Sequence, residues 1–172
     1  MKYFVAIFGL VACTVASAAR LPDAPSAGSK LEALDRDLYQ CVSTDQGSEC
    51  RRKGNQADRI ATEPVIEIVL FYRDDILVRS VFAFSEAHLE ALVEQLSGEL
   101  GAPQQGSELL IAGMGGVFEN RYYTWRLNGQ VWFVEQYFER VTSSGLWRMD
   151  AAEFAAFQSE RDRVRVRGAR DL

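Results

Sequence analysis

The sequence has little of what metal sites and thiol chemistry require. Its 172 residues include one histidine, His88, and three cysteines, none of them in a Cys-x-x-Cys spacing. This scarcity excludes multi-histidine metal centres and thiol-rich zinc modules. Lysine is also rare, and the net charge is −5. Because no dense basic block is present, we expect no nucleic-acid partner.

No apolar run is long enough to cross a bilayer as a helix, which needs about 20 apolar residues. The longest run, Tyr3–Val15, follows Lys2 and precedes small residues at 16–18. This pattern predicts a secretory signal peptide over 1–18, and hence a periplasmic or secreted protein without a transmembrane span. In the alternative, the residues up to Cys13 resemble a bacterial lipobox and would make the chain a lipoprotein anchored there.

Two cysteines remain once the signal peptide is removed. Loss of residues 1–18 takes Lys2 and Cys13 away, so the net charge becomes −6 and the thiols left are Cys41 and Cys50. An even pair of cysteines in an oxidising compartment predicts a disulfide bond. A reactive dithiol is the alternative, and it is disfavoured because redox sites use the Cys-x-x-Cys spacing.

The remaining chain is expected to form one domain over 29–160. Residues 19–28 are small, contain proline and suggest a flexible leader, and residues 161–172 suggest a frayed basic tail. A short helix is expected over 30–41, where four apolar residues recur on one helical face: Leu31, Leu34, Leu38 and Cys41. The basic residues 51–53 are interpreted as a solvated loop or, alternatively, as an anion-binding or surface patch.

Two hairpins and a helix follow. Residues 65–72 and 76–84 are rich in β-branched and aromatic side chains and predict the first hairpin. A leucine helix capped by Ser85 comes next, and Gly101 ends it. A loop is expected over 102–119. Its glycine-rich residues 113–116 do not have the glycine spacing of a nucleotide-binding loop. Because the residues around them are apolar, this loop is expected to pack over a sheet edge or to form a movable contact surface.

Asn128-Gly129 predicts the second hairpin, with strands over 121–127 and 130–140. A two-residue loop fixes the register and places Trp125 opposite Trp132, where we expect both indoles to be buried. A short strand over 146–149 and a helix capped by Asp150 and Glu153, which carries Phe154 and Phe157, complete the chain. The order predicts an α+β fold: an antiparallel sheet of about four or five strands, a central amphipathic helix packed on one face, and short helices near both ends.

The second face of the 130–138 strand is the candidate binding surface. Tyr122, Phe133 and Tyr137 share this face, opposite Trp132. A terminal helix with its two phenylalanines could cover them, or the face could remain open for a protein or an apolar ligand. In the second case these three aromatic residues would bind it.

No constellation of catalytic side chains stands out. Glu67 and Glu135 are strand carboxylates in apolar company and could form an acid–base pair. The favoured interpretation is a structural ion pair with Arg79 and Arg126 on neighbouring strands, or a solvated face. His88 lies three residues after a serine that we expect to cap a helix, so a Ser-His nucleophile is disfavoured. We therefore expect no enzyme, no metal and no cofactor.

Residues 77–103 combine a strand ending in Phe-x-Phe, a serine-capped leucine helix and a Leu-Gly-Ala-Pro stop, and a Tyr-Thr-Trp strand and an Asn-Gly hairpin come later. This order resembles small uncharacterised envelope proteins of Gram-negative bacteria, whose usual tyrosine is replaced by Leu100 here. The resemblance implies an antiparallel sheet with a packed helix and a periplasmic address, and it transfers no catalytic residue.

The expected function is that of a secreted, non-enzymatic domain acting through protein contacts, as an accessory, inhibitor or assembly factor. The alternative is a small carrier that binds an apolar ligand between sheet and helix.

Overall fold

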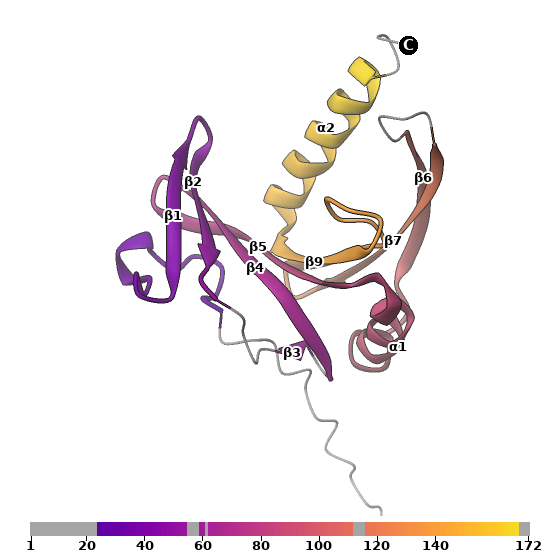
Figure 1. Cartoon of the computed structure of the whole chain (residues 1–172), viewed down its shortest axis with the longest axis horizontal. Coiled ribbons are helices and arrows are strands. Elements are labelled where there is room, and N and C mark those ends of the chain that lie inside the picture. Colours follow the sequence, from indigo (N-terminus) through magenta and orange to yellow (C-terminus); the bar gives the residue numbers. More distant parts are fainter. Residues whose placement is uncertain (1–23, 55–58, 61, 112–115, 169–172) are drawn as a thin grey trace, which may run out of the picture.

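The computed structural model describes residues 24–54, 59–60, 62–111 and 116–168. Within them, nine antiparallel strands form one sheet in the order β1-β2-β4-β5-β9-β8-β7-β6, with β3 paired to β4 (Figure 1). The strands are β1 (Tyr39–Thr44), β2 (Gly47–Arg52), β3 (Arg59–Ile60), β4 (Glu63–Arg73), β5 (Ile76–Ser85), β6 (Gln104–Ile111), β7 (Val117–Leu127), β8 (Gln130–Glu135) and β9 (Ser143–Asp150). The helices are α1 (Leu89–Leu100) and α2 (Ala151–Gly168), with 3-10 turns at Leu31–Ala33 and Glu86–His88.

The expected α+β fold with four or five strands is therefore wrong, because the chain is mostly sheet. Four of the strands, β1, β2, β3 and β6, come from segments that we expected to be helix or loop. The expected signal peptide at 1–18, the alternative anchor Cys13 and the glycine-rich residues 113–115 lie outside the described residues. The tail expected from 161 onward is helical as far as Gly168.

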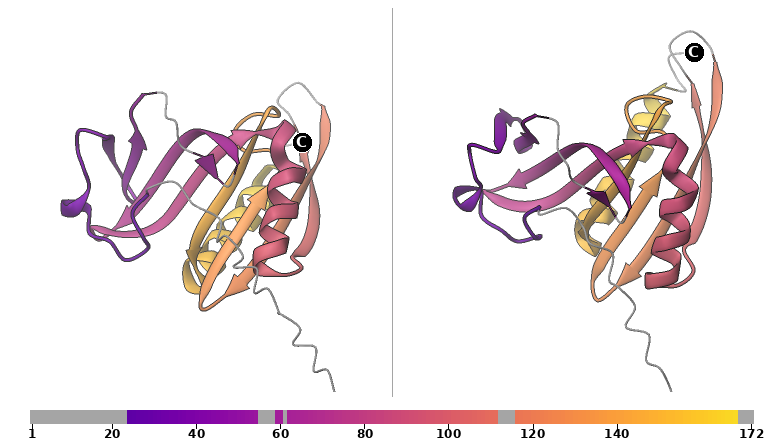
Figure 2. Two further views of the ribbon diagram at one scale, coloured as in Figure 1. Left: turned by 90° about the horizontal axis from the view of Figure 1, so that it is seen from below. Right: turned by 60° about the horizontal axis from the view of Figure 1, so that its bottom comes forward.

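Helix α1 packs on one face of the sheet. Its buried side chains Leu89, Leu92 and Leu96 join a core that includes Phe82 and Leu146. The predicted leucine helix is confirmed, and it buries one apolar stripe. Gly101, at φ 86°, ends the helix as predicted. Figure 2 shows α1 running alongside β7.

Helix α2 packs on the opposite face. The sheet is bent so that its two ends, β1–β2 and β6–β7, stand on either side of this helix (Figures 1 and 2). Phe154 and Phe157 of α2 belong to a second core with Val131, Phe133 and Trp147 of the sheet. The sheet is therefore a central layer with a buried cluster on each face.

The predicted hairpin registers are confirmed where a short turn fixes them. Trp125 lies opposite Trp132, and Asn128 and Gly129 both have positive φ. Trp125 is buried and its indole N–H donates to the carbonyl of Gly101, whereas Trp132 is only half-buried. Two-residue turns thus predict pairing reliably, while the depth of burial depends on what packs above the pair.

The helix expected over 30–41 is not formed. One 3-10 turn occurs at Leu31–Ala33, the Asp35 carboxylate accepts the N–H of Asp37, and β1 begins at Tyr39. An aspartate that bonds to nearby backbone favours a turn over a helix. The backbone of this segment instead hydrogen-bonds to the β4–β5 hairpin, since the N–H of Leu31 donates to the carbonyl of Asp75.

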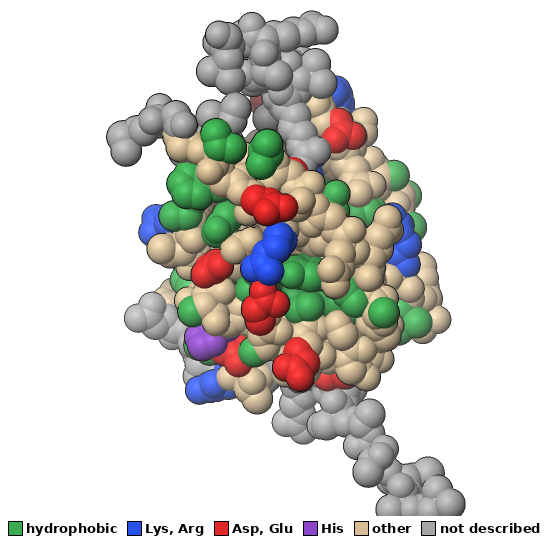
Figure 3. Space-filling view, turned by 90° about the vertical axis from the view of Figure 1, so that its right-hand side faces the viewer, with side chains coloured by type: hydrophobic (Ala, Val, Ile, Leu, Met, Phe, Trp, Pro, Cys, Tyr) green, Lys and Arg blue, Asp and Glu red, His purple; other side chains and the backbone are tan. Residues whose placement is uncertain are grey.

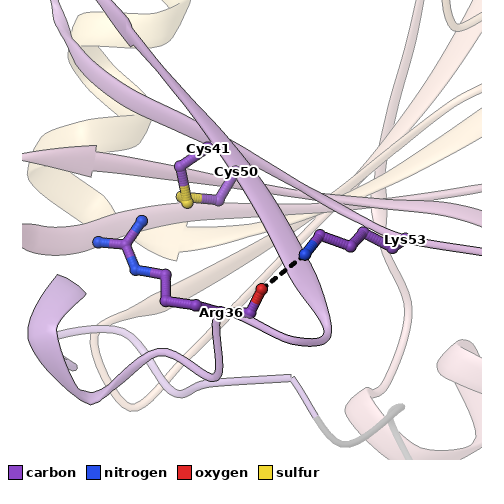
Figure 4. Close-up of a disulfide and its surroundings, with 4 residues drawn as sticks. All are labelled: Arg36, Cys41, Cys50 and Lys53. Carbon is purple, nitrogen blue, oxygen red and sulfur yellow. Dashed lines mark hydrogen bonds between the residues drawn. A yellow bond between two sulfur atoms is a disulfide. The ribbon is translucent and has the colours of Figure 1, made fainter.

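Cys41 and Cys50 are joined, as predicted (Figure 4). They lie directly opposite each other on β1 and β2, so the bond ties the edge strand to its neighbour. Lys53 closes the same hairpin by donating to the carbonyl of Arg36 at 2.7 Å. The basic run that we interpreted as a loop is therefore partly strand, because the disulfide and the β2–β4 pairing hold it in the sheet.

Substitution Cys41→Ser is expected to lower the free energy of unfolding by about 2–3 kcal/mol, because the unfolded chain regains the entropy of a closed loop. Urea denaturation of the mature protein with and without reductant measures this loss. Thiol labelling of the denatured, unreduced protein is the control and should modify neither cysteine. Labelling of both would contradict the bond.

Strand β6 replaces the first part of the loop expected over 102–119. Gln, Gly, Ser and Glu are poor strand formers, which is why local propensity misses it. Eight residues of β6 nevertheless pair without a break with β7. Gly106 fits this pairing because a Cβ there would collide with the ring of Tyr122 across the strand pair.

Candidate functional site

The face that carries Phe133 is closed by α2. Phe133 is 2% exposed, and its ring centroid lies 5.7 Å from those of Phe154 and Phe157. Aromatic pairs at this separation contribute to packing beyond the area they bury. Phe133 therefore lies in a core and not on an open surface.

Tyr122 and Tyr137 border this core at different places. Tyr122 is half-buried, packs 5.7 Å from Phe133 and lines a small cavity of about 160 Å³. Tyr137 lines a larger cavity of about 410 Å³, together with Trp147 and Phe157. The three predicted binding residues share a face, but they do not line one common site. The larger cavity is the candidate functional site.

A charged network borders this cavity. Arg161 of α2 donates to Glu135 of β8 at 2.9 Å and also to Glu108 of β6. The indole N–H of Trp147 donates to the other oxygen of Glu135 at 2.8 Å, and the side-chain amide of Asn120 donates to Glu108 at 3.0 Å. One guanidinium therefore connects two strands of the sheet to the helix above them.

The two carboxylates share this one cation in a poorly hydrated place. Burial raises the pKa of the Glu135 carboxyl, and the nearby Arg161 and Trp147 only partly oppose this effect. The guanidinium also lies 5.0 Å from the ring of Phe133 and 5.3 Å from that of Phe157. Both carboxylates accept hydrogen bonds from donors that the fold holds in place. The arrangement therefore suits a structural link between the sheet and α2 better than an acid–base pair.

A second buried ion pair anchors the start of α2. The guanidinium of Arg79 on β5 lies 3.3 Å from the Glu153 carboxylate. The same carboxylate accepts a hydrogen bond from Arg73 at 2.8 Å. Burial lowers the pKa of Arg79, and its guanidinium lies 4.8 Å from the ring of Phe71. The predicted cap is confirmed, since the Asp150 carboxylate accepts the N–H of Glu153 at 2.7 Å.

The glutamates singled out in the sequence are paired with arginine, although the expected partners are wrong. Glu67 binds Arg51 at 2.6 Å, and Glu135 binds Arg161. The guanidinium of Arg126 instead lies 4.9 Å from the Phe154 ring. Glu67 of β4 finds its arginine on the paired strand β2, whereas Glu135 of β8 finds its arginine on α2. Strands that are adjacent in the sequence therefore do not determine the partner.

His88 forms no Ser-His pair. Its Nδ1 lies 2.5 Å from Glu63, and the side chain of Ser85 makes no capping hydrogen bond. In the described ranges, no three His, Cys, Asp or Glu side chains are grouped to hold a metal ion. None of the helices there has both the length and the apolar content needed to cross a membrane.

A scan against protein-family models and searches of curated proteins and of solved structures gave no match. The resemblance to envelope proteins therefore rests on the sequence motifs alone.

The sequence interpretation missed Arg161 and Glu108. Arg161 was placed in a frayed tail, yet it follows Phe154 and Phe157 at the spacing of one helical face, and that spacing was a usable signal. Glu108 gave no such signal, because it was placed in a loop and only the pairing of β6 with β7 brings it opposite Asn120.

Proposed function

We propose that this chain is an exported, non-enzymatic protein that acts through protein contacts, and that the outer edge of β6 accepts an extended segment of its partner. The observation that carries the proposal is the position of β6. It is the last strand in the sheet order, and within the described residues nothing pairs with its outer edge. Such an edge presents free N–H and C=O groups that can pair with another strand.

This edge, residues 104–111, carries no lysine, proline or bulge, which usually prevent strand addition. The carboxylate of its one charged residue, Glu108, is held by Arg161 and Asn120. The other edge strand of the sheet is β1, which the disulfide ties to β2.

Apolar side chains lie beside the open edge. Leu109 is 71% exposed and Val117 is 62% exposed, with Phe118 partly exposed next to them. Figure 3 shows hydrophobic side chains in the upper part of this side of the molecule. Exposed apolar groups next to free backbone suit a partner that adds a strand and packs alternate side chains.

Export is supported by the pattern of residues 1–18 and by the disulfide, since disulfides persist in oxidising compartments. The proposed site of action is therefore the periplasm or the exterior of the cell. The exported protein is either released after cleavage of the signal peptide or anchored to a membrane by a lipid at Cys13, and the proposal includes both cases.

The test uses a photo-crosslinking amino acid at Ser107 of β6, incorporated in the producing cell. We expect a discrete adduct, and we expect Leu109→Lys to abolish it because a charge on an edge strand opposes strand addition. Leu127→Lys, at an exposed leucine on the far end of β7, is the matched control and should retain the adduct. Absence of an adduct, or an adduct that survives Leu109→Lys, would overturn the proposal.

A second candidate function is supported by the larger cavity. Its volume of about 410 Å³ lies within the usual range of small-molecule sites, and it lies between the sheet and α2. This position suits a carrier. Native mass spectrometry of protein purified without detergent would show a co-purifying ligand, and a ligand-free mass would count against the carrier.

A further inference from the structure

The walls of the larger cavity combine aromatic rings with acidic side chains. Its rings come from Tyr137, Phe138, Trp147 and Phe157. These rings already lie near cations in this fold, since the guanidinium of Arg79 is 5.8 Å from the Trp147 ring and 5.5 Å from the Phe157 ring. Aromatic faces attract cations through their quadrupole, and they also pack against apolar groups.

Negative charge exceeds positive charge in the same walls. Four carboxylates line the cavity: Glu108, Glu135, Glu139 and Glu160. Against them stand two guanidiniums, and both already have carboxylate partners, Arg161 with two of these glutamates and Arg79 with Glu153. The cavity therefore has a surplus of acidic groups that its own arginines do not balance.

The surplus is concentrated at two of the glutamates. Glu139 lies 3.5 Å from Arg51, but that guanidinium also binds Glu49 and Glu67 at 2.6 Å. Glu160 accepts a hydrogen bond from the neutral amide of Gln46 at 3.3 Å, and the nearby guanidinium of Arg79 also interacts with Glu153. Both carboxylates thus share their nearest guanidinium with other glutamates, and both are accessible enough to meet a ligand.

We propose that this cavity binds a small organic cation, in which an ammonium or guanidinium group is carried on an apolar stem. The stem packs against the rings of Trp147 and Phe157, and the charge faces Glu139 and Glu160. This inference names the ligand chemistry of the carrier function and rests on that candidate alone. It is independent of β6, so the crosslinking result neither supports nor weakens it.

The experiment compares three probes of one shape by isothermal titration calorimetry with the mature protein at neutral pH. Phenethylamine is the cation, 2-phenylethanol is its neutral counterpart and 3-phenylpropanoate is an anion. We expect saturable binding of the amine and much weaker binding of the alcohol and the carboxylate. In a nitrogen–proton correlation spectrum, the amine should shift the indole N–H of Trp147.

A charge-removing pair of variants locates the site. Glu139→Gln with Glu160→Gln should weaken amine binding roughly fivefold, since each exposed pair contributes modestly. Glu94→Gln with Glu119→Gln removes the same charge from exposed positions outside the cavity and should leave the affinity unchanged. The proposal is overturned if no probe binds, if the carboxylate binds as tightly as the amine, or if both double variants behave alike.

Discussion

Replacing Phe133 with alanine is expected to lower the free energy of unfolding by about 3–5 kcal/mol and to lower the melting temperature. The ring is almost fully buried between the sheet and two phenylalanines of α2, and it also contacts Tyr122. Truncation to alanine would lose the favourable free energy of burying the ring. It would also leave a cavity, which the hydrogen-bonded strands cannot move in to fill.

Urea denaturation followed by circular dichroism measures this loss. Phe118→Ala is the matched control, because Phe118 is an aromatic residue on the same hairpin but is partly exposed. Its substitution should cost less than about 1 kcal/mol. If Phe133→Ala left the midpoint unchanged, the face beneath α2 would be an accessible surface, and the three predicted aromatic residues would be available to bind a partner there.

Replacing Arg161 with methionine is expected to lower the free energy of unfolding by about 3–5 kcal/mol at neutral pH. The variant leaves Glu108 and Glu135 buried without the cation that they share. The aliphatic stem of methionine keeps much of the contact with Phe133 and Phe157, so the loss reports mainly on charge.

The same variant should be less destabilising in acid. Burial already raises the pKa of Glu135, and removal of Arg161 takes away the group that most opposes this. A carboxyl whose pKa is higher in the folded state binds its proton more tightly there. Its contribution to stability is therefore full below the ordinary glutamate pKa of about 4.3 and is lost as the pH rises through the raised pKa.

Urea midpoints of the wild type and the variant at pH 5 and pH 8 test this dependence. The difference between the two proteins should widen from pH 5 to pH 8. Arg163→Met, at an exposed position on the same helix, serves as the control and should show no such widening. A difference that stays constant with pH would mean that the two buried carboxylates do not depend on Arg161.

Parts of this fold follow from local sequence, and others do not. The Asn128-Gly129 turn determines the register that pairs Trp125 with Trp132, and the leucine spacing correctly places α1. The disulfide follows from cysteine number and the expected compartment. For the turn and the helix, the deciding interactions lie within a few residues or within one helical face.

The strands β1, β2 and β6 could not be predicted in this way. Leu31 and Leu34 have helical spacing, yet their segment hydrogen-bonds to β5 because tertiary pairing outweighs a weak local preference. Ile66 shows the same limit, since a register shift between Val65 and Glu67 leaves this apolar residue 62% exposed. A bulge changes which side chains share a face, and strict alternation cannot foresee it.

The candidate site was predictable only in part. Tyr137 was identified from the apolar second face, and it does line the larger cavity. The acidic walls arise from β6, β8, the turn after β8 and α2, which meet only after folding. Single residues on four separate segments carry no shared spacing in the sequence.

Helix α2 closes the second face of the sheet, and β6 is left as an open edge. Amide hydrogen exchange of the intact monomer tests this arrangement, because protection reports which backbone groups are hydrogen-bonded and covered. We expect slow exchange throughout β8 and around Phe154 and Phe157 in α2, with alternate amides of β6 exchanging fast at its outer edge. Fast exchange across α2 and β8 would show that the helix does not cover this face, and protection of every β6 amide in the monomer would show that the edge is already paired.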